Sequence, residues 1–247
     1  MVEIRTAERP APGRLSEDRV FVLSNAVIVL DGVTSGRPPA RNGGWYAQTL
    51  GQELLAQLAG GGADLADLLA AAIGNVNERH GLTADDSPAT TVAIVRWTDR
   101  EVDVLVLADS PVVVFGDSTH VIADTRIAAL RPVVEDILSH KNRPGGYWVA
   151  EGDPRAAHQA IRKTLPRDAV QKVIIATDGV SCAVDEYRIF PSWQSVLELI
   201  AAAGLEAVLD EIRAAELTDP SRTRWPRAKI HDDQALAVID LDGDQRH

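Results

Sequence analysis

Three apolar runs in this sequence each end at an aspartate. The runs and the acids that follow them are 26–30 with Asp31, 104–108 with Asp109, and 173–177 with Asp178. Short apolar runs bounded by turn residues are typical of buried strands. If these strands end at one rim of the core, their carboxylates repel one another and lose hydration, so a cation must hold them there. We expect that cation to be a pair of hard divalent metal ions.

Two acidic pairs extend this pattern, Glu17-Asp18 and Asp232-Asp233. Residues 19–23 and 26–30 are predicted to form a hairpin, which puts Glu17-Asp18 at the same end as Asp31. Asp232-Asp233 stands at the entry of the last predicted strand. A single Asp-Gly pair is more often a turn than a metal site. The prediction therefore rests on the joint pattern, in which all of these acids lie at strand boundaries.

Composition limits the classes of function. The chain has 247 residues, 45% hydrophobic and 25% charged, which is ordinary for a globular protein with a sizeable core. Its formal net charge of −11 argues against a nucleic-acid partner, because phosphate backbones are bound by clustered Lys and Arg. One cysteine, Cys182, excludes an internal disulfide framework and a paired-cysteine zinc site. No apolar run approaches the roughly 18 residues of a membrane span, and the polar first 14 residues are unlike a signal peptide. We therefore expect a cytoplasmic protein with no membrane partner.

Periodicity and capping residues predict the elements that position the acids. Helices are expected at 45–58, 65–76, 154–165, 192–203 and 205–217. Strands are also expected at 19–23, 90–97, 102–107, 112–115, 120–123 and 235–241, and those between 90 and 123 are expected to form an antiparallel meander. Loops are expected at 36–44, 218–231 and 144–148, the last being exposed and mobile. Residues 1–14 are either a loose arm or a first edge strand.

This order of elements predicts an α+β fold of packed antiparallel sheets flanked by helices. Helices interrupt antiparallel strand pairs instead of alternating with single strands, which argues against a doubly wound sheet. The lack of a G-x-G-x-x-G or Walker motif agrees. No repeat or long linker divides the chain, so we expect residues 1–247 to form a single domain, with 1–12 as a loose arm and 242–247 as a tail.

The acids also match a known family in their order along the chain. Each motif is short, but together they extend over residues 13–241 with the expected strands and helices between them. The motifs are Ser16-Glu17-Asp18, Asp31-Gly32, Pro88-Ala89-Thr90, Ala108-Asp109-Ser110, Thr177-Asp178-Gly179 and Asp232-Asp233. This arrangement resembles that of the PP2C-type (PPM) metal-dependent serine/threonine phosphatases.

The resemblance implies a fold, a cofactor and a set of roles. The fold would be a four-layer α/β/β/α sandwich with two Mn²⁺ or Mg²⁺ ions at one end of its sheets. A metal-activated water would hydrolyse phosphoserine or phosphothreonine in a phosphorylated protein substrate, and oxygen ligands suit these hard ions. The implied metal ligands are Glu17, Asp31, the backbone carbonyl of Gly32, Asp178 and Asp232, with Asp109 for a labile third ion. Asp31, Asp178 and Asp232 would be the catalytic acids, and Asp18 and Asp233 would support them.

The sequence departs from the family pattern at the flanks of several motifs. Val33-Thr34-Ser35 follows Gly32 where many members have another glycine or a histidine, so a histidine general acid is missing. Ala108 replaces the usual glycine before the third acid, and the usual threonine after Asp232-Asp233 is lacking. Arg14 is near the position of the family's phosphate-binding arginine but is spaced one residue differently, so a solvated arginine is an equal alternative.

Two other functions stay open at this point. One is a PP2C-like module that has lost effective catalysis and binds a phosphorylated partner, and the other is a phosphatase of a small phosphorylated metabolite. Segments 33–44 and 139–153 are expected to shape the pocket that decides between substrates. The C-x5-R pattern from Cys182 to Arg188 is rejected as a phosphate loop, because the two acids inside it would repel a phosphate. Cys182 is expected to be a structural thiol, and His231 is expected to lie on a loop.

Overall fold

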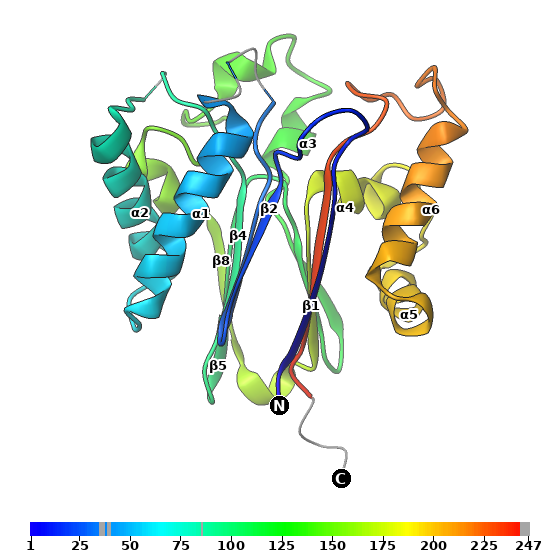
Figure 1. The fold of residues 1–247 in the computed structure, drawn as a ribbon, viewed down its shortest axis with the longest axis horizontal. Helices are drawn as coiled ribbons and strands as arrows, with labels where there is room; N and C mark the ends of the chain where they lie inside the picture. The colour runs from blue at the N-terminus through cyan, green and yellow to red at the C-terminus, as the bar shows by residue number, and fades with distance from the viewer. Residues whose placement is uncertain (35–37, 39–40, 85, 243–247) are drawn as a thin grey trace.

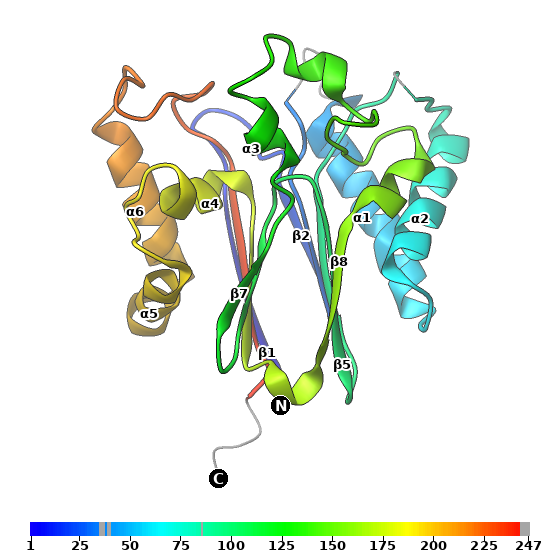
Figure 2. The same cartoon turned by 180° about the vertical axis from the view of Figure 1, so that it is seen from behind.

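The structure is a computed structural model that describes residues 1–34, 38, 41–84 and 86–242. Within these residues the strands form two five-stranded antiparallel sheets packed face to face, in the orders β1-β10-β9-β6-β7 and β2-β3-β4-β5-β8. Helices α1 and α2 cover the outer face of the second sheet, and α4, α5 and α6 cover that of the first (Figures 1 and 2). The predicted α/β/β/α sandwich is confirmed.

The elements have the following bounds. The strands are β1 (Glu3–Arg9), β2 (Arg19–Leu23), β3 (Ala26–Leu30), β4 (Val92–Trp97), β5 (Glu101–Leu107), β6 (Val112–Phe115), β7 (Thr119–Ile122), β8 (Ile161–Pro166), β9 (Lys172–Ala176) and β10 (Gln234–Asp240). The helices are α1 (Gly43–Ala59), α2 (Leu65–His80), α3 (Arg126–Leu130), α4 (Asp178–Asp185), α5 (Trp193–Ala203) and α6 (Leu205–Leu217). The short 3-10 turns are η2 (Ile137–His140), η3 (Pro154–Gln159) and η4 (Arg167–Ala169). Among the described residues, no helix is both long and apolar enough to cross a membrane.

Strand β3 explains why the first apolar run is unbroken. Val27 and Val29 pack into the core between the two sheets. Ala26, Ile28 and Leu30 alternate with them and pack beneath α1 and α2. A strand buried on both faces needs apolar residues at every position instead of every second one. The run therefore ends where the core ends, and the next residue, Asp31, marks that boundary.

Close backbone contact brings the start of α1 against the end of β3. A Cβ on Gly32 would lie 2.4 Å from the carbonyl carbon of Gly43, and a Cβ on Gly43 would lie 2.5 Å from the Val33 carbonyl oxygen. Only glycine allows two backbones to approach this closely. The side chain of Asn42 caps the helix by accepting from the N–H of Trp45 at 2.9 Å. The positive end of α1 thus lies next to the acidic end of the sheet.

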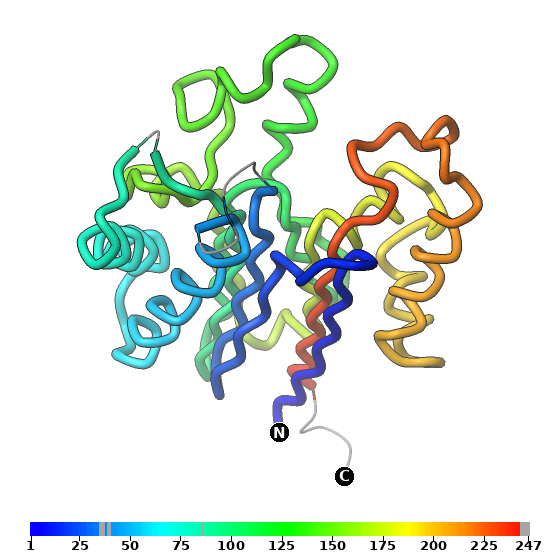
Figure 3. Tube along the Cα trace, turned by 45° about the horizontal axis from the view of Figure 1, so that its top comes forward, coloured from blue at the N-terminus to red at the C-terminus, as the bar shows by residue number. Residues whose placement is uncertain are grey.

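Two predictions near the N-terminus and in the strand-rich middle need correction. Residues 3–9 form β1, which pairs along its length with β10, so the edge strand and not the loose arm is the correct alternative (Figure 3). Residues 90–123 do not form one meander. β4 and β5 belong to one sheet, whereas β6 and β7 belong to the other. Residues 108–111 cross between the sheets, and this crossing places Asp109 at their common end.

Two further predictions were wrong downstream. The expected helix 154–165 is the 3-10 turn η3 followed by strand β8, which pairs with β5 as an edge strand. The segment 144–148 is a loop, as predicted, but only Pro144 and Gly145 are exposed; Tyr147 is buried against Val149 and Ala89. The predicted helices 192–203 and 205–217 and the loop 218–231 are confirmed, whereas α4 was not predicted. Of the predicted loop 36–44, residues 36, 37, 39 and 40 lie outside the described residues, as do 243–247 of the predicted tail.

Candidate functional site

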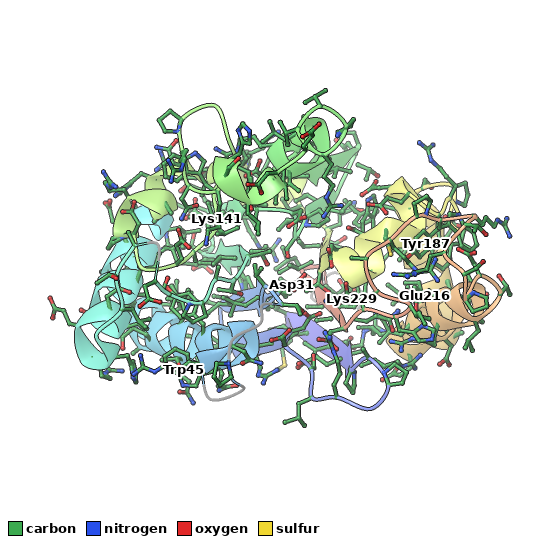
Figure 4. The ribbon with its side chains drawn as sticks, turned by 90° about the horizontal axis from the view of Figure 1, so that it is seen from above. Asp31, Trp45, Lys141, Tyr187, Glu216 and Lys229 are labelled. Carbon is green, nitrogen blue, oxygen red and sulfur yellow. The ribbon has the colours of Figure 1, made fainter. Side chains whose placement is uncertain are left out.

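The acids that the sequence singled out lie together at one end of the two sheets. The negative charges of Asp18, Asp178, Asp232 and Asp109 all act on Asp31. Figure 4 looks down on this end and places Asp31 near the centre of the molecule, between the two helical layers. Glu17 belongs to the same group, because one Arg14 guanidinium nitrogen lies 3.9 Å from Glu17 and 4.0 Å from Asp232. The predicted site residues therefore converge on one region.

Hydroxyl side chains hold Asp31 in place. Its N–H donates to Thr91 Oγ1 at 3.0 Å, and its carbonyl accepts from the Thr91 N–H at 2.9 Å and from Thr90 Oγ1 at 2.8 Å. Thr91 Oγ1 lies 2.7 Å from Ser110 Oγ, next to Asp109. The Thr90-Thr91 pair therefore ties the end of β3 to the crossing segment, which gives a structural reason for a threonine after Pro88-Ala89.

Asp233 positions the segment that carries Glu17. Its carboxylate accepts from the N–H groups of Ala11 (2.7 Å) and Glu17 (2.9 Å) and from Arg14 (3.0 Å). Burial alone would raise the pKa of Asp233, but these donors outweigh it and hold the pKa below its usual value. Thr34 Oγ1 donates to Glu17 Oε2 at 2.6 Å from the other side. Asp233 is thus an ionised anchor for residues 11–17.

Asp178 begins helix α4, and its neighbours fix that start. Thr177 Oγ1 donates to the buried carboxylate of Asp18 at 2.8 Å. A Cβ on Gly179 would lie 1.9 Å from the Asp233 carbonyl oxygen, so this position must be glycine for α4 to pack against the entry of β10. The Thr-Asp-Gly motif is therefore explained by packing on both sides of the acid.

Asp109 follows a residue in an unusual conformation. Ala108 is fully buried and has a φ of 68°, in the left-handed region where glycine is preferred. The chain keeps this backbone conformation although it has alanine where the family pattern has glycine. Arg131 lies 3.8 Å from Asp109 and 3.8 Å from Glu186, so its guanidinium faces the acids at longer than hydrogen-bond distance.

Two cavities, of about 700 Å³ and 660 Å³, meet at the acids. The first extends toward α4 and the 226–229 segment, and the second toward residues 137–149. The residues lining both are Asp109, Ile127, Arg131, Asp178, Lys229 and Asp232. Val33 and Thr34 line the second cavity, in agreement with the expectation for 33–44, as do Lys141, Tyr147 and Val149 from 139–153.

The cluster is electrostatically strained in its ionised form. Burial, followed by the charges of Asp18, Asp178 and Asp232, raises the pKa of Asp31 well above its usual value. Burial, followed by Asp109 and Asp232, raises the pKa of Asp178 to about 7. Burial also raises the pKa of Asp109 and, strongly, that of Asp18. Of these four acids only Asp18 is fully buried, and the others are partly exposed at the cavities. Acids with raised pKa values that line a cavity are typical of functional sites.

The donor set fits a hard divalent cation in chemistry and charge. Its side chains offer carboxylate oxygens, which Mg²⁺ and Mn²⁺ prefer, and a cation would relieve their repulsion. Within the described residues, no three His, Cys, Asp or Glu side chains are close enough as they stand to hold an ion. The fit is therefore one of ligand chemistry and charge, and not of a ready-made geometry.

The structure shows the surroundings of three further residues that the sequence analysis discussed, Arg14, His231 and Cys182. Arg14 is engaged by Asp233 and is not among the described residues that line either cavity. His231 lies on the predicted loop, where its Nδ1 is 2.7 Å from the buried Glu216 carboxylate. Cys182 packs in α4 beside the helical core, and burial raises the pKa of its thiol, which is the opposite of an activated nucleophile.

Sequence reasoning singled out Arg14 but missed two other cations of the site, Lys229 and Arg131. Lys229 Nζ donates to Asp232 Oδ1 at 2.6 Å, and Lys229 lies close to Asp31 in Figure 4. Arg131 faces Asp109 from the loop after α3. The only sequence signal for Lys229 was its position three residues before Asp232, within a segment read as a polar loop.

A family model described as Protein phosphatase 2C matches residues 13–212 of this sequence. This match extends over more than half of the chain and identifies the class of protein as a phosphatase. The chain belongs to the protein phosphatase 2C family. No curated protein matches the sequence.

Solved structures described as serine or serine/threonine phosphatases share the fold. One described as a bacterial serine phosphatase is 15% identical, with a TM-score of 0.66 over 100% of both chains. Serine/threonine phosphatase Stp1 from Staphylococcus aureus is 14% identical, with a TM-score of 0.67 over 98% of this chain and 96% of that one. The catalytic domain of the serine threonine protein phosphatase PstP, solved with two manganese ions, is 17% identical, with a TM-score of 0.54 over 97% of this chain and 99% of that one.

Proposed function

We propose that this chain is a metal-dependent phosphatase that hydrolyses phosphoserine and phosphothreonine in proteins. The observation that carries the proposal is the cluster of carboxylates with raised pKa values where two cavities meet. Family membership and the manganese-bound PstP structure support the same reading.

The proposed ligands divide between the segments that end at the cluster. They are Glu17, Asp31, the Gly32 carbonyl, Asp178 and Asp232, with Asp109 for a third ion. Bound Mn²⁺ or Mg²⁺ would supply Lewis acidity and a water of lowered pKa. Thr90 and Thr91 hold Asp31 in position, and Asp233 holds the backbone of Glu17.

Arg131 is the residue we propose for binding the substrate phosphate. Its side chain is 56% exposed and lines both cavities, and its nearest acids are 3.8 Å away. Its guanidinium therefore has donors available for a phosphate dianion. Arg14, the candidate from sequence, already donates to Asp233 at 3.0 Å.

The test is hydrolysis of p-nitrophenyl phosphate and of a phosphothreonine peptide by metal-stripped protein with Mn²⁺ or EDTA. We expect hydrolysis in the presence of Mn²⁺ and none in EDTA. The rate of hydrolysis should fall at least about a hundredfold in Asp178→Ala, since removing one electrostatic group from a reaction centre costs about that much. Asp168→Ala is the matched control, because Asp168 is an exposed aspartate in η4. The preceding residue, Arg167, donates its N–H to the carbonyl of Arg100 in the turn between β4 and β5.

Each alternative function has its own outcome in this assay. Tight peptide binding with no hydrolysis under any metal condition would refute the phosphatase and favour the phosphate-binding module. Efficient hydrolysis of small phosphomonoesters with none of the peptide would favour a metabolite phosphatase. Equal activity of Asp178→Ala and Asp168→Ala would refute the proposed site.

A further inference from the structure

Lys229 is a cation built into the acidic cluster. Its ammonium donates to Asp232 Oδ1 at 2.6 Å, and only 30% of its side chain is exposed. It lines both cavities, and Asp31, which lines the second of them, acts on it electrostatically. Figure 4 shows both residues near the centre of this end of the sheets. It therefore lies against one proposed metal ligand and near another.

The segment that carries Lys229 is held firmly at both ends. Asp219 accepts from the N–H groups of residues 223–225 and, at 2.8 Å, from Arg227. His231 is hydrogen-bonded to the buried Glu216 of α6 at 2.7 Å. These anchors fix the backbone on either side of position 229. The lysine is thus placed by the fold, unlike a surface lysine on a free loop.

The electrostatics of the cluster keep Lys229 charged. Burial alone would lower the pKa of its ammonium, but the hydrogen bond and charge of Asp232, together with the charge of Asp31, outweigh it and raise the pKa. In return, Lys229 opposes the rise in the pKa of Asp178. One ammonium therefore compensates part of the charge on three proposed ligands.

We infer that Lys229 is an internal counter-ion that competes with the divalent metal ion for the acidic cluster. An incoming ion must displace the ammonium from Asp232 or bind in its repulsive field. In either case the lysine weakens metal binding, and it stabilises the chain when metal is absent. The inference rests on the proposed metal centre and adds a residue that sets the metal concentration at which the protein loads.

The experiment is calorimetric titration of metal-stripped protein with MnCl₂, comparing wild type with Lys229→Gln. We expect the variant to bind Mn²⁺ about tenfold more tightly, which corresponds to about 1.4 kcal/mol. Lys163→Gln is the matched control, since Lys163 is an exposed lysine on β8 and its substitution changes the net charge equally. Lys229→Met serves as a second variant if the glutamine variant does not fold.

Melting temperatures provide a readout that a purely structural lysine would not give. We expect Lys229→Gln to melt below wild type in EDTA, because the acids lose their counter-ion, and to gain more than wild type from millimolar Mn²⁺. If Lys229 had only a structural role, Lys229→Gln would melt below wild type by the same amount in EDTA and in Mn²⁺.

The outcomes separate this inference from the proposed metal centre. If wild type binds Mn²⁺ and the Lys229 variants bind it equally or more weakly, the competition is refuted and the metal centre stands. If only the variants bind Mn²⁺, the lysine blocks the site and the inference is supported. If neither binds Mn²⁺, the metal centre is refuted and the inference with it.

Discussion

Replacing Asp178 with asparagine should stabilise the metal-free protein. The change keeps the shape of the side chain and removes its charge. Asp178 has a pKa of about 7, raised first by burial and then by the charges of Asp109 and Asp232. A hydrogen bond with Asp31 and the charge of Lys229 oppose the rise without cancelling it. At neutral pH and above, the folded chain therefore carries a carboxylate that it holds less favourably than water does.

The sign and the size follow from proton linkage. Because the folded state binds the Asp178 proton more tightly than the unfolded state, the stability it contributes is full below about pH 4 and is lost as pH rises through about 7. The gap between 3.8 and about 7, at about 1.4 kcal/mol per pH unit, sets an upper limit of about 4 kcal/mol at pH 8. Loss of a favourable charge at the start of α4 offsets about 0.3–1 kcal/mol. Relaxation of the neighbouring acids reduces the gain further, so we expect roughly 2 kcal/mol.

Urea unfolding in EDTA measures the effect directly. Asp178→Asn should be more stable than wild type at pH 8, with an unchanged m-value, and the difference should shrink toward pH 4. Asp168→Asn, in the exposed turn η4, should match wild type at both pH values. Adding Mn²⁺ at pH 8 should reverse the order, because a ligand at a hundred times its Kd contributes about 2.7 kcal/mol to wild type and little to a variant lacking one ligand.

Two results would refute the reasoning in different ways. If Asp178→Asn is less stable than wild type in EDTA at pH 8, the carboxylate is not held at an electrostatic cost. If the variant is stabilised but gains as much from Mn²⁺ as wild type does, Asp178 is not a metal ligand.

Two further predictions concern neighbouring positions. Ala108→Val should cost at least about 2 kcal/mol in urea unfolding, because a β-branched side chain strains a buried left-handed residue. Ala108→Gly should change stability by less than about 1 kcal/mol; a large loss would mean that the methyl group outweighs the strain. Arg14→Met should cost about 1–3 kcal/mol, because buried Asp233 loses its charged donor and keeps only the N–H groups of Ala11 and Glu17. It should leave KM for p-nitrophenyl phosphate within about twofold. A large rise in KM with unchanged stability would show that Arg14 binds the substrate phosphate.

The placement of Asp31, Asp109 and Asp178 could be predicted because each follows a buried strand. A run such as Ala26 to Leu30 must stop being apolar where it leaves the core, and Asp31 follows there. The helices α5 and α6 were equally accessible, since Val196 and Ile200, and then Val208 and Ile212, recur at helical spacing and are buried. A local sequence pattern predicts an element correctly when the spacing of the apolar residues within that segment already shows which of its faces is buried.

The errors arose where distant partners decide the conformation. Strand β8 (Ile161–Pro166) is exposed at nearly every position, so it lacks the alternation of apolar and polar residues that identifies a half-buried strand. It is extended because it pairs with the edge of β5. The crossing at residues 108–111 looks like any short hairpin connection, yet it changes sheets because β6 pairs with β9, which lies much later in the chain. Tyr147 is buried because it packs against Ala89 and Val149. None of these partners could be identified from the local sequence pattern.

The need for a cation at the acids was predictable, but its source was not. Charge repulsion among the acids requires compensation, and metal ions were the expected answer. Within the described residues, Arg14, Arg131 and Lys229 supply part of it from the protein itself, through Asp233, Asp109 and Asp232 respectively. A chain that compensates its own site can fold before it meets metal. Each such cation also opposes the ion that the site would bind, so stability without metal and affinity for metal should trade against each other at these three positions.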